Sequence, residues 1–266
     1  MAIVNLITNY TKIIELQDNI YSNYVLSKKI GIKRDVFESW NSWYSYNNQW
    51  YFFKNFTCDK YESLEFKLIN ELIGEELSKY LNIDVIHYEI AKLGNIYGLA
   101  SLSFFKQKNK YYFSKDINIY PNHVNMKNIR LLKYECKNDS NYIELINEIY
   151  KLTALDIYMN QTDRNYSNYQ FRRENGYLHL APLYDFEESF VEPFKYYYDS
   201  DLLGISFENI NNYPRLKQYI DMLLDIDINK ILLNIEKERG IVISKKYKDY
   251  YFEYIKDRKC LLKSFK

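Results

Sequence analysis

Hydrophobic periodicity changes from strand-like to helical along this chain, and few folds accommodate such a change. The first part contains short runs rich in aromatic and β-branched residues, separated by turn signals. These runs span 50–54, 85–92 and 97–105. From about Asn141 onward the apolar residues follow helical spacing. The helical segments are 142–158, 215–224, 228–239 and 245–262. The pattern predicts an α+β fold in which a small β-rich part precedes a larger, mainly helical part.

One helix is predicted within the β-rich part, from about Glu62 to Leu81. Its apolar residues recur at spacings of three and four; they are Phe66, Ile69, Ile73, Leu77 and Tyr80. Asp59, three residues before Glu62, is a candidate for a capping box at the start of this helix. A β-rich part with one helix, followed by a helical part, is the outline of a protein-kinase-like fold.

Length and charge narrow the kinds of partner. With 266 residues, the chain suits one large domain or two smaller parts that share a cleft. A net charge of +1 provides no general attraction to nucleic acid or to membranes. No apolar run approaches the roughly 20 residues that a membrane helix needs. The first residues lack a secretory signal, so we expect a cytoplasmic protein that does not bind a membrane.

Two further features have simpler explanations than a binding site. The 30 tyrosines could stack on single-stranded nucleic acid. However, Lys, Asn and Ile are abundant as well, and all four residue types have AT-rich codons, so we expect no direct contact with nucleic acid. Cys58, Cys136 and Cys260 lie far apart, and the three histidines have no ligand spacing. We therefore expect reduced thiols and no cysteine or histidine metal site.

A group of polar residues in the helical part has the spacing that phosphoryl transfer requires. This reaction needs a carboxylate that orients the attacking hydroxyl group and oxygen ligands for Mg²⁺. Asp163 and Asn168 have the Asp-x-x-x-x-Asn spacing of the base and a metal ligand in protein kinases. Asp185-Phe186 begins 17 residues after Asn168, and a hairpin turning at Gly176 would bring Asp185 back beside it. We expect Asp163 to be the catalytic base, and Asn168 and Asp185 to be metal ligands.

Longer stretches around these residues carry a more specific signal. The chain has Asn160 and Thr162-Asp163-Arg164, then Asn168, and then Leu180-Ala181-Pro182-Leu183-Tyr184-Asp185. This resembles the HipA-like serine/threonine kinases, which typically show Asn-x-Thr-Asp-Arg-His, an Asn five residues after the Asp, and Leu-Ala-Pro-Leu-Tyr/Phe-Asp. Asn165 stands where the family usually has His. Since Asn165 is neither the expected base nor a metal ligand, this departure bears on rate more than on mechanism.

The β-rich part carries matching signals. The strand 50–54 ends at Lys54, which is expected to reach the α- and β-phosphates of ATP and to pair with a Glu on the following helix. Glu71 is the preferred partner, with Glu62 and Glu65 as alternatives. The segment 71–83 and Tyr88-Glu89-Ile90 resemble the family's Glu-rich helix, Leu-Gly-Ile turn and Tyr-Glu-Leu strand. Asn82 replaces the usual Gly and suits a left-handed helix cap.

The adenine site is expected where the strand 97–105 resembles the strand that enters the family's interlobe hinge. Backbone groups near Ser103, Phe104 and Phe105 should hydrogen-bond the adenine ring, with apolar neighbours on both sides of it. Gly31-Ile32-Lys33-Arg34 occupies the place of a phosphate-covering loop. It lacks the Gly-x-Gly-x-x-Gly pattern of eukaryotic kinases.

The resemblance implies a bilobal protein-kinase-like domain, with an N-lobe over 1–105 and a C-lobe over 106–266. It also implies the short form of the family, without the extra N-terminal subdomain of larger HipA proteins. The implied activity is ATP- and Mg²⁺-dependent phosphorylation of serine or threonine in a protein substrate.

HipA-like kinases are often toxins of toxin–antitoxin pairs that phosphorylate translation factors, so an antitoxin protein is a further implied partner. Family members also phosphorylate a serine of their own phosphate-covering loop; the candidates here are Ser22, Ser27, Ser39, Ser42 and Ser45. Three alternatives stay open: a small-molecule kinase of related fold, a nucleotide-binding pseudokinase, and a metal-dependent hydrolase that uses the same carboxylates. The compact segment after Asp185 disfavours the first, and the presence of Asp163, Asn168 and Asp185 disfavours the second.

Overall fold

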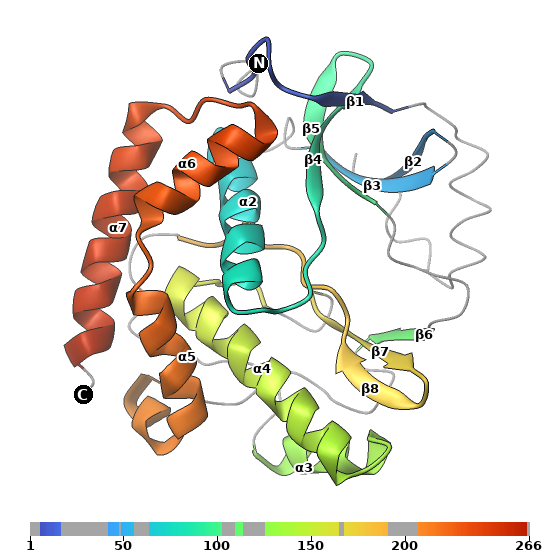
Figure 1. Ribbon diagram of the computed structural model, residues 1–266, viewed down its shortest axis with the longest axis vertical. Helices are drawn as coiled ribbons and strands as arrows, with labels where there is room; N and C mark the ends of the chain where they lie inside the picture. The colour runs from blue at the N-terminus through green and yellow to red at the C-terminus, as the bar shows by residue number, and fades with distance from the viewer. Residues whose placement is uncertain are drawn as a thin grey trace.

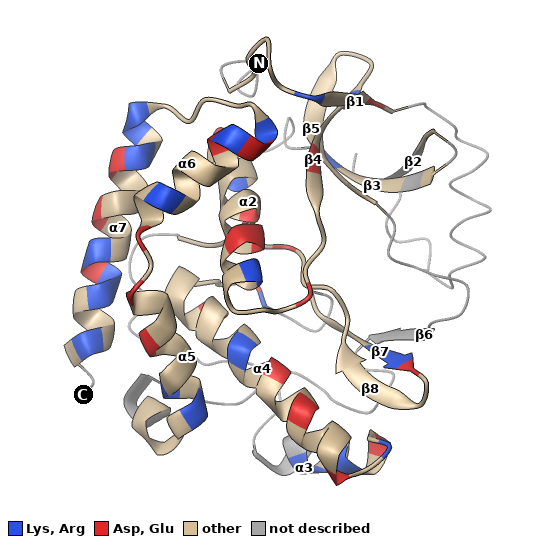
Figure 2. Ribbon diagram, viewed as in Figure 1, with Lys and Arg blue, Asp and Glu red and all other residues tan. Residues whose placement is uncertain are grey.

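The computed structural model shows a mixed α/β fold in which a small sheet lies beside a group of helices (Figure 1). The described residues are 6–16, 42–47, 49–55, 64–102, 110–113, 126–164, 168–190 and 207–264. Among them, no helix is both long and apolar enough to cross a bilayer. Both basic and acidic residues occur along α7 (Lys245–Ser264), and Lys and Arg outnumber Asp and Glu (Figure 2).

Five of the described strands form one sheet in the order β1-β4-β5-β3-β2. They are β1 (Ile13–Glu15), β2 (Ser42–Tyr46), β3 (Gln49–Asn55), β4 (Tyr88–Leu93) and β5 (Ile96–Leu102). Neighbouring strands are antiparallel, except that β1 pairs with β4 in parallel. A smaller sheet has the order β6-β7-β8. Its strands are β6 (Lys110–Phe113), β7 (Gln170–Glu174) and β8 (Tyr177–Leu180).

Alternation along β3 places Lys54 on the helix-covered face of the larger sheet. Tyr51 and Phe53 are buried in a small apolar cluster on the opposite face, so Lys54 must point the other way. Lys54 lies opposite Leu99 in the register of β3 and β5, and Leu99 packs in the main core together with the residues of α2 (Leu64–Tyr80). The pleat of the sheet therefore aims the lysine at this helix.

The helix α2 covers the sheet and is buried along most of its length. Ile69, Ile73 and Leu77 are fully buried, as their spacing predicts, but Tyr80 is 48% exposed because it lies at the C-terminal end of the helix. Asn82 follows with a φ of 53°, which confirms the expected left-handed cap. The proposed capping box at Asp59 and Glu62 lies outside the described residues.

The remaining helices form the lower and left parts of the view in Figure 1. They are α3 (Met126–Glu135), α4 (Asp139–Met159), the 3₁₀ helix η5 (Phe207–Asn212), α5 (Pro214–Leu224), α6 (Ile228–Arg239) and α7. The second half of α4 is buried without interruption from Leu152 to Met159, because other elements pack around it. One large apolar core joins α2 to the helices α4, α5, α6 and α7.

A hairpin and a short parallel contact bring the segment after β8 to the foot of α2. The strands β7 and β8 form the predicted hairpin, with Asn175 and Gly176 at positive φ in its turn. The chain then runs beside the loop after α2. The Ile86 N–H donates to the Leu183 carbonyl at 3.0 Å, and the Leu183 N–H donates to the Asp84 carbonyl at 2.8 Å. These bonds fix the backbone two residues before Asp185 against the loop that follows α2.

Candidate active site

Lys54 lies at the centre of a buried group of carboxylates. Its side chain is 10% exposed, and its Nζ donates to Glu71, to Asp185 at 2.5 Å and to Glu187 at 3.3 Å. Glu71 comes from α2, whereas Asp185 and Glu187 come from the loop after β8. Of the three glutamates considered as partners of Lys54, Glu71 makes the contact, and Glu62 lies outside the described residues. Three separate stretches of chain thus meet at one ammonium group.

Burial and charge have opposing effects on the pKa values of this group. Burial alone would lower the pKa of Lys54, but the negative charges of Asp185, Glu71 and Glu187 raise it well above the usual value. Burial raises the pKa of Glu71 despite the opposing charge of Lys54. For Asp185, burial is outweighed by the charge and hydrogen bond of Lys54, so its pKa is lowered. The lysine and the aspartate are therefore held in their charged forms.

A backbone contact fixes Asp185 relative to Glu71. One oxygen of the Glu71 carboxylate contacts Lys54, and the other accepts the N–H of Phe186 at 2.9 Å. Asp185 itself has a φ of 67°, an uncommon conformation for a residue with a side chain. Phe186 is fully buried and lies against Gly74 of α2, one helical turn beyond Glu71. The Glu71 carboxylate and the space left by Gly74 therefore hold Phe186, the residue that follows Asp185, against α2.

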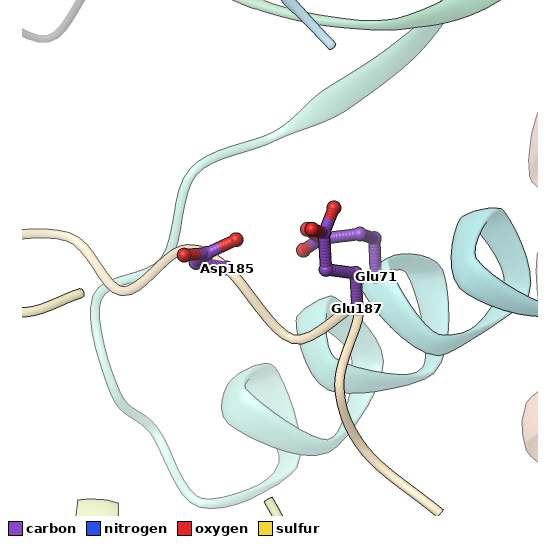
Figure 3. Close-up of side chains that lie close together, drawn as sticks. All are labelled: Glu71, Asp185 and Glu187. Carbon is purple, nitrogen blue, oxygen red and sulfur yellow. The ribbon is translucent and has the colours of Figure 1, made fainter. Parts of the chain in front are cut away.

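The carboxylates of Glu71, Asp185 and Glu187 form an acidic cluster (Figure 3). One oxygen from each lies within 4.8 Å of the others. When all are ionised, three negative charges face the single positive charge of Lys54, which leaves an excess of two. Carboxylate oxygens are the ligands that Mg²⁺ prefers in proteins. The donor atoms and the charge at this point fit a divalent cation.

Asp163 and Asn168 meet in a second polar group. The Asn168 Nδ2 donates to the Asp163 carbonyl at 2.6 Å and to its carboxylate oxygen Oδ2 at 3.1 Å. Asp163 is exposed, whereas Asn168 is buried. The amide nitrogen of Asn168 is directed at Asp163, and its Oδ1 is the atom of the type that binds Mg²⁺. The two residues with kinase-like spacing are thus in direct contact.

Gln161 connects the two polar groups. Its Nε2 donates to the Asp185 carbonyl at 2.6 Å, and its Oε1 accepts the N–H of Asp163 at 3.3 Å. Its side chain is almost fully buried. A single amide thus spans from the residue proposed as base to a residue proposed as metal ligand. Residues 165–167, which include Asn165, lie outside the described residues.

Arg164 is buried and contacts the chain next to both the Asp163–Asn168 pair and Asp185. Its Nε and Nη2 contact the carboxylate of Asp156 on α4 at 3.2 Å. Its Nη1 donates to the carbonyls of Asn168 at 2.7 Å and of Tyr184 at 2.8 Å. The guanidinium group also lies 5.0 Å from the centroid of the Phe186 ring. Arg164 therefore holds Asn168 and the residue before Asp185 on one rigid donor group.

The structure brings Lys54, Glu71 and Asp185 together and places Asp163 against Asn168. The expected adenine contacts, Ser103, Phe104 and Phe105, lie outside the described residues. Glu187, Arg164 and Gln161 were not among the residues predicted for the site. The sequence does not distinguish Glu187 from the adjacent Glu188. Only the structure shows that Glu187 contacts Lys54, whereas Glu188 contacts Lys67.

Comparison with known proteins shows a likeness of fold. No family model matches the chain. Among curated proteins, none matches its sequence. The fold is similar to that of the proinflammatory kinase CtkA of Helicobacter pylori, with a TM-score of 0.59 and 15% identity over 83% of this chain and 90% of CtkA.

It is also similar to HipA of Shewanella oneidensis, solved with HipB and operator DNA, with a TM-score of 0.57 and 12% identity over 97% of this chain and 73% of HipA. The chain therefore has the kinase-like fold shared by HipA and CtkA.

Proposed function

We propose that this protein is an ATP- and Mg²⁺-dependent serine/threonine protein kinase of HipA-like type. The observation that carries the proposal is the contact of Lys54 on β3 with both Glu71 on α2 and Asp185 after β8. Protein kinases require a strand lysine paired with a helix glutamate, and a metal-binding aspartate close by. That contact occurs here in a fold similar to two kinases.

In this proposal Lys54 binds the α- and β-phosphates of ATP, and Glu71 keeps the lysine in place. Asn168 and Asp185 hold the magnesium ion, and Glu187 lies close enough to Lys54 to add negative charge at the same point. A magnesium ion held there would supply positive charge to the β- and γ-phosphates and so would ease departure of ADP. Adenine would be held by backbone groups near Ser103–Phe105.

Asp163 acts as the base on the substrate hydroxyl group. Because its side chain is exposed, a hydroxyl group of a protein substrate can reach it. The hydroxyl oxygen attacks the γ-phosphorus, its proton passes to Asp163, and the bond from the γ-phosphorus to the bridging oxygen of ADP breaks. Asn168 and Gln161 contact Asp163 from its own loop and hold it in position.

We further propose that the physiological substrate is a protein and that an antitoxin protein is a partner. The second proposal draws on the similar HipA, which was solved as part of a toxin–antitoxin system. A cytoplasmic location and an N-lobe and C-lobe meeting near residue 105 belong to the same proposal. Self-phosphorylation belongs to it as well, although Ser22, Ser27, Ser39 and the loop 31–34 lie outside the described residues.

The substitution Asp163→Asn tests the proposed base. It keeps the size of the side chain and the contact with Asn168, but removes the group that accepts the proton. We expect Mg-ATP binding to be retained and phosphate transfer to fall by roughly 10²–10⁴-fold. Transfer from radiolabelled ATP to the protein itself and to a generic protein substrate measures this effect.

Three other results of this experiment have distinct meanings. Near wild-type transfer by Asp163→Asn would remove Asp163 from the role of base. A wild-type protein that binds Mg-ATP but transfers no phosphate would be a pseudokinase. Transfer to a sugar, antibiotic or lipid headgroup, with none to any protein, would make it a small-molecule kinase of related fold.

A further inference from the structure

Four residues on one face of α2 contact the segment that follows Asp185. Asn70 and Glu71 lie three and four residues after Lys67, and Gly74 lies four and three residues after them, so the four residues share one face of the helix. All four are buried. The Lys67 ammonium group pairs with Glu188 at 2.7 Å, Glu71 accepts the N–H of Phe186, and Gly74 faces the Phe186 ring. The fourth member, Asn70, has no role in the mechanism described above.

Asn70 makes three hydrogen bonds that cross-link three elements. Its Nδ2 donates to the carbonyls of Glu187 at 2.9 Å and of Ser189 at 2.7 Å. Its Oδ1 accepts the hydroxyl proton of Tyr251 on α7 at 2.7 Å. Its side chain is fully buried. The amide therefore joins α2, the loop after Asp185 and the last helix.

The chemistry of the partners fixes the orientation of this amide. Backbone carbonyls only accept hydrogen bonds, so the nitrogen of Asn70 must face Glu187 and Ser189. Tyr251 is fully buried, and burial raises the pKa of its hydroxyl well above the usual value. The hydroxyl group therefore keeps its proton and donates it to the oxygen of Asn70. No other orientation of the side chain satisfies all three partners.

The position of Asn70 in the sequence gives these bonds a consequence for the site. Asn70 directly precedes Glu71, the partner of Lys54, and the loop residues it holds lie two and four positions after Asp185. The helix carrying one charge partner of Lys54 is thus bonded to the loop carrying the other two. From the opposite side, the Thr162 N–H and hydroxyl group both contact the Glu188 carbonyl.

We propose that Asn70, oriented by Tyr251, is a positioning residue that sets Asp185 for binding of Mg-ATP. The inference rests on the proposed function and adds to it a residue that touches neither nucleotide nor metal. Asn70 acts through the backbone of residues 187–189, which fixes where Asp185 and Glu187 point. The last helix thereby contributes to the site through one hydroxyl group.

A double-mutant cycle tests whether Asn70 acts through Asp185. Calorimetric titration with Mg-ATP is done on the wild type, Asn70→Ala, Asp185→Asn and the double variant. We expect Asn70→Ala to weaken binding by about tenfold in the wild-type background and by less than about twofold in the Asp185→Asn background, because coupled residues are not additive. Equal losses in the two backgrounds would overturn the proposal.

Ser78→Ala is the matched control. Ser78 is also fully buried on α2, and its hydroxyl group bonds only within the helix, to the Gly74 carbonyl at 2.7 Å. We expect Ser78→Ala to lower the melting temperature without changing the Mg²⁺ concentration for half-maximal phosphate transfer. Asn70→Ala should raise that concentration and lower kcat. If Ser78→Ala and Asn70→Ala change this Mg²⁺ concentration and kcat equally, Asn70 has only a structural role.

The experiment stays decisive if Asn70→Ala does not fold or if the wild type does not bind Mg-ATP. If Asn70→Ala does not fold, Tyr251→Phe replaces it in the cycle. This change keeps the donors of Asn70 and removes the hydroxyl bond that orients them, together with a longer contact of the same hydroxyl to the Phe66 carbonyl at 3.3 Å. A wild-type affinity for Mg-ATP in Tyr251→Phe would then contradict the proposal. If the wild type itself does not bind Mg-ATP, the proposed function is wrong; if it binds and Asn70→Ala binds equally well, only the present inference is wrong.

Discussion

At the residue scale, Gly74 leaves room for the ring that anchors the loop after Asp185. A Cβ atom at this position would lie 2.3 Å from Cγ of Phe186, far inside van der Waals contact. Phe186 is also stacked near Arg164 and bonded through its N–H to Glu71, so the ring has little freedom to retreat. A glycine within a helix usually weakens it by about 1 kcal/mol relative to alanine, and here the close contact accounts for the glycine.

We predict that Gly74→Ala is destabilising despite the better helix propensity of alanine. Overpacking of this kind costs about 1–3 kcal/mol, and displacement of Phe186 would also move Asp185. Urea unfolding measures the first effect, and titration with Mg-ATP measures the second. The double variant Gly74→Ala/Phe186→Leu, with a smaller side chain, should recover part of both losses. Gly74→Ala with wild-type stability and affinity would contradict the prediction.

The residues of the site differ in how far the sequence could reveal them. The pair of Lys54 and Glu71 could be anticipated, because the resemblance to kinases implies a strand-end lysine paired with a glutamate on the next helix; Glu62 and Glu65 stayed open as partners. Asn70 and Gln161 could not, since a single amide side chain reads as an ordinary polar residue. Their partners are backbone groups of residues 185–189, and only the fold brings these groups within reach.

At the scale of elements, α2 is tied to α6 and β4 by a second buried carboxylate. Glu75 is fully buried, and it contacts Arg239 at the end of α6 at 2.7 Å, the His87 ring at 2.7 Å and the N–H of Tyr88 at 3.1 Å. Burial works to raise the pKa of Glu75, but the hydrogen bond from His87 and the charge of Arg239 outweigh it and hold the pKa at about 2.

We predict that Glu75 makes folding stability depend on pH in the acid range. Because its pKa is lowered from 4.5 to about 2, its contribution is complete above pH 4.5 and is lost as the pH falls toward 2. Between pH 6 and pH 3 the wild type should lose about 2 kcal/mol more stability than Glu75→Gln. Urea unfolding at several pH values measures the difference, and parallel curves for the two proteins would contradict it.

The elements themselves were predictable where a local pattern defines them. The bounds of α6 match the prediction, Ile228–Arg239, because its apolar spacing is regular and it ends at Gly240 with a φ of 63°. The strands β1 and β6 were not predicted. Each is short and pairs with a strand far away in sequence, β4 and β7 respectively. Strand formation at such an edge depends on the partner more than on local propensity.

At the scale of the whole molecule, the acidic cluster and Lys54 lie where three parts of the fold meet. Lys54 comes from the large sheet, Glu71 from the helix that covers it, and Asp185 and Glu187 from the loop that follows the small sheet. A ligand that binds at this junction binds only the folded chain, and it should therefore stabilise the entire molecule. When all three carboxylates are ionised, their negative charge exceeds that of Lys54 and would repel the phosphates of ATP unless a cation accompanies them.

We therefore predict that Mg-ATP raises the melting temperature, whereas ATP with a chelator does not. A ligand at 100 times its Kd stabilises the folded state by about 2.7 kcal/mol, which corresponds to roughly 5–10 °C for a chain of this size. Asn168→Ala and Asp185→Ala should each reduce the shift.

Asp221→Ala, which removes a half-exposed carboxylate on α5, is the control and should leave the shift in melting temperature unchanged. Since Asp185→Ala also removes the ion pair with Lys54 and so changes the stability of the free protein, the quantity to compare is the shift between ligand-free and ligand-bound forms of each variant. A full shift in both site variants, or an equal shift with ATP and chelator, would place the cation elsewhere.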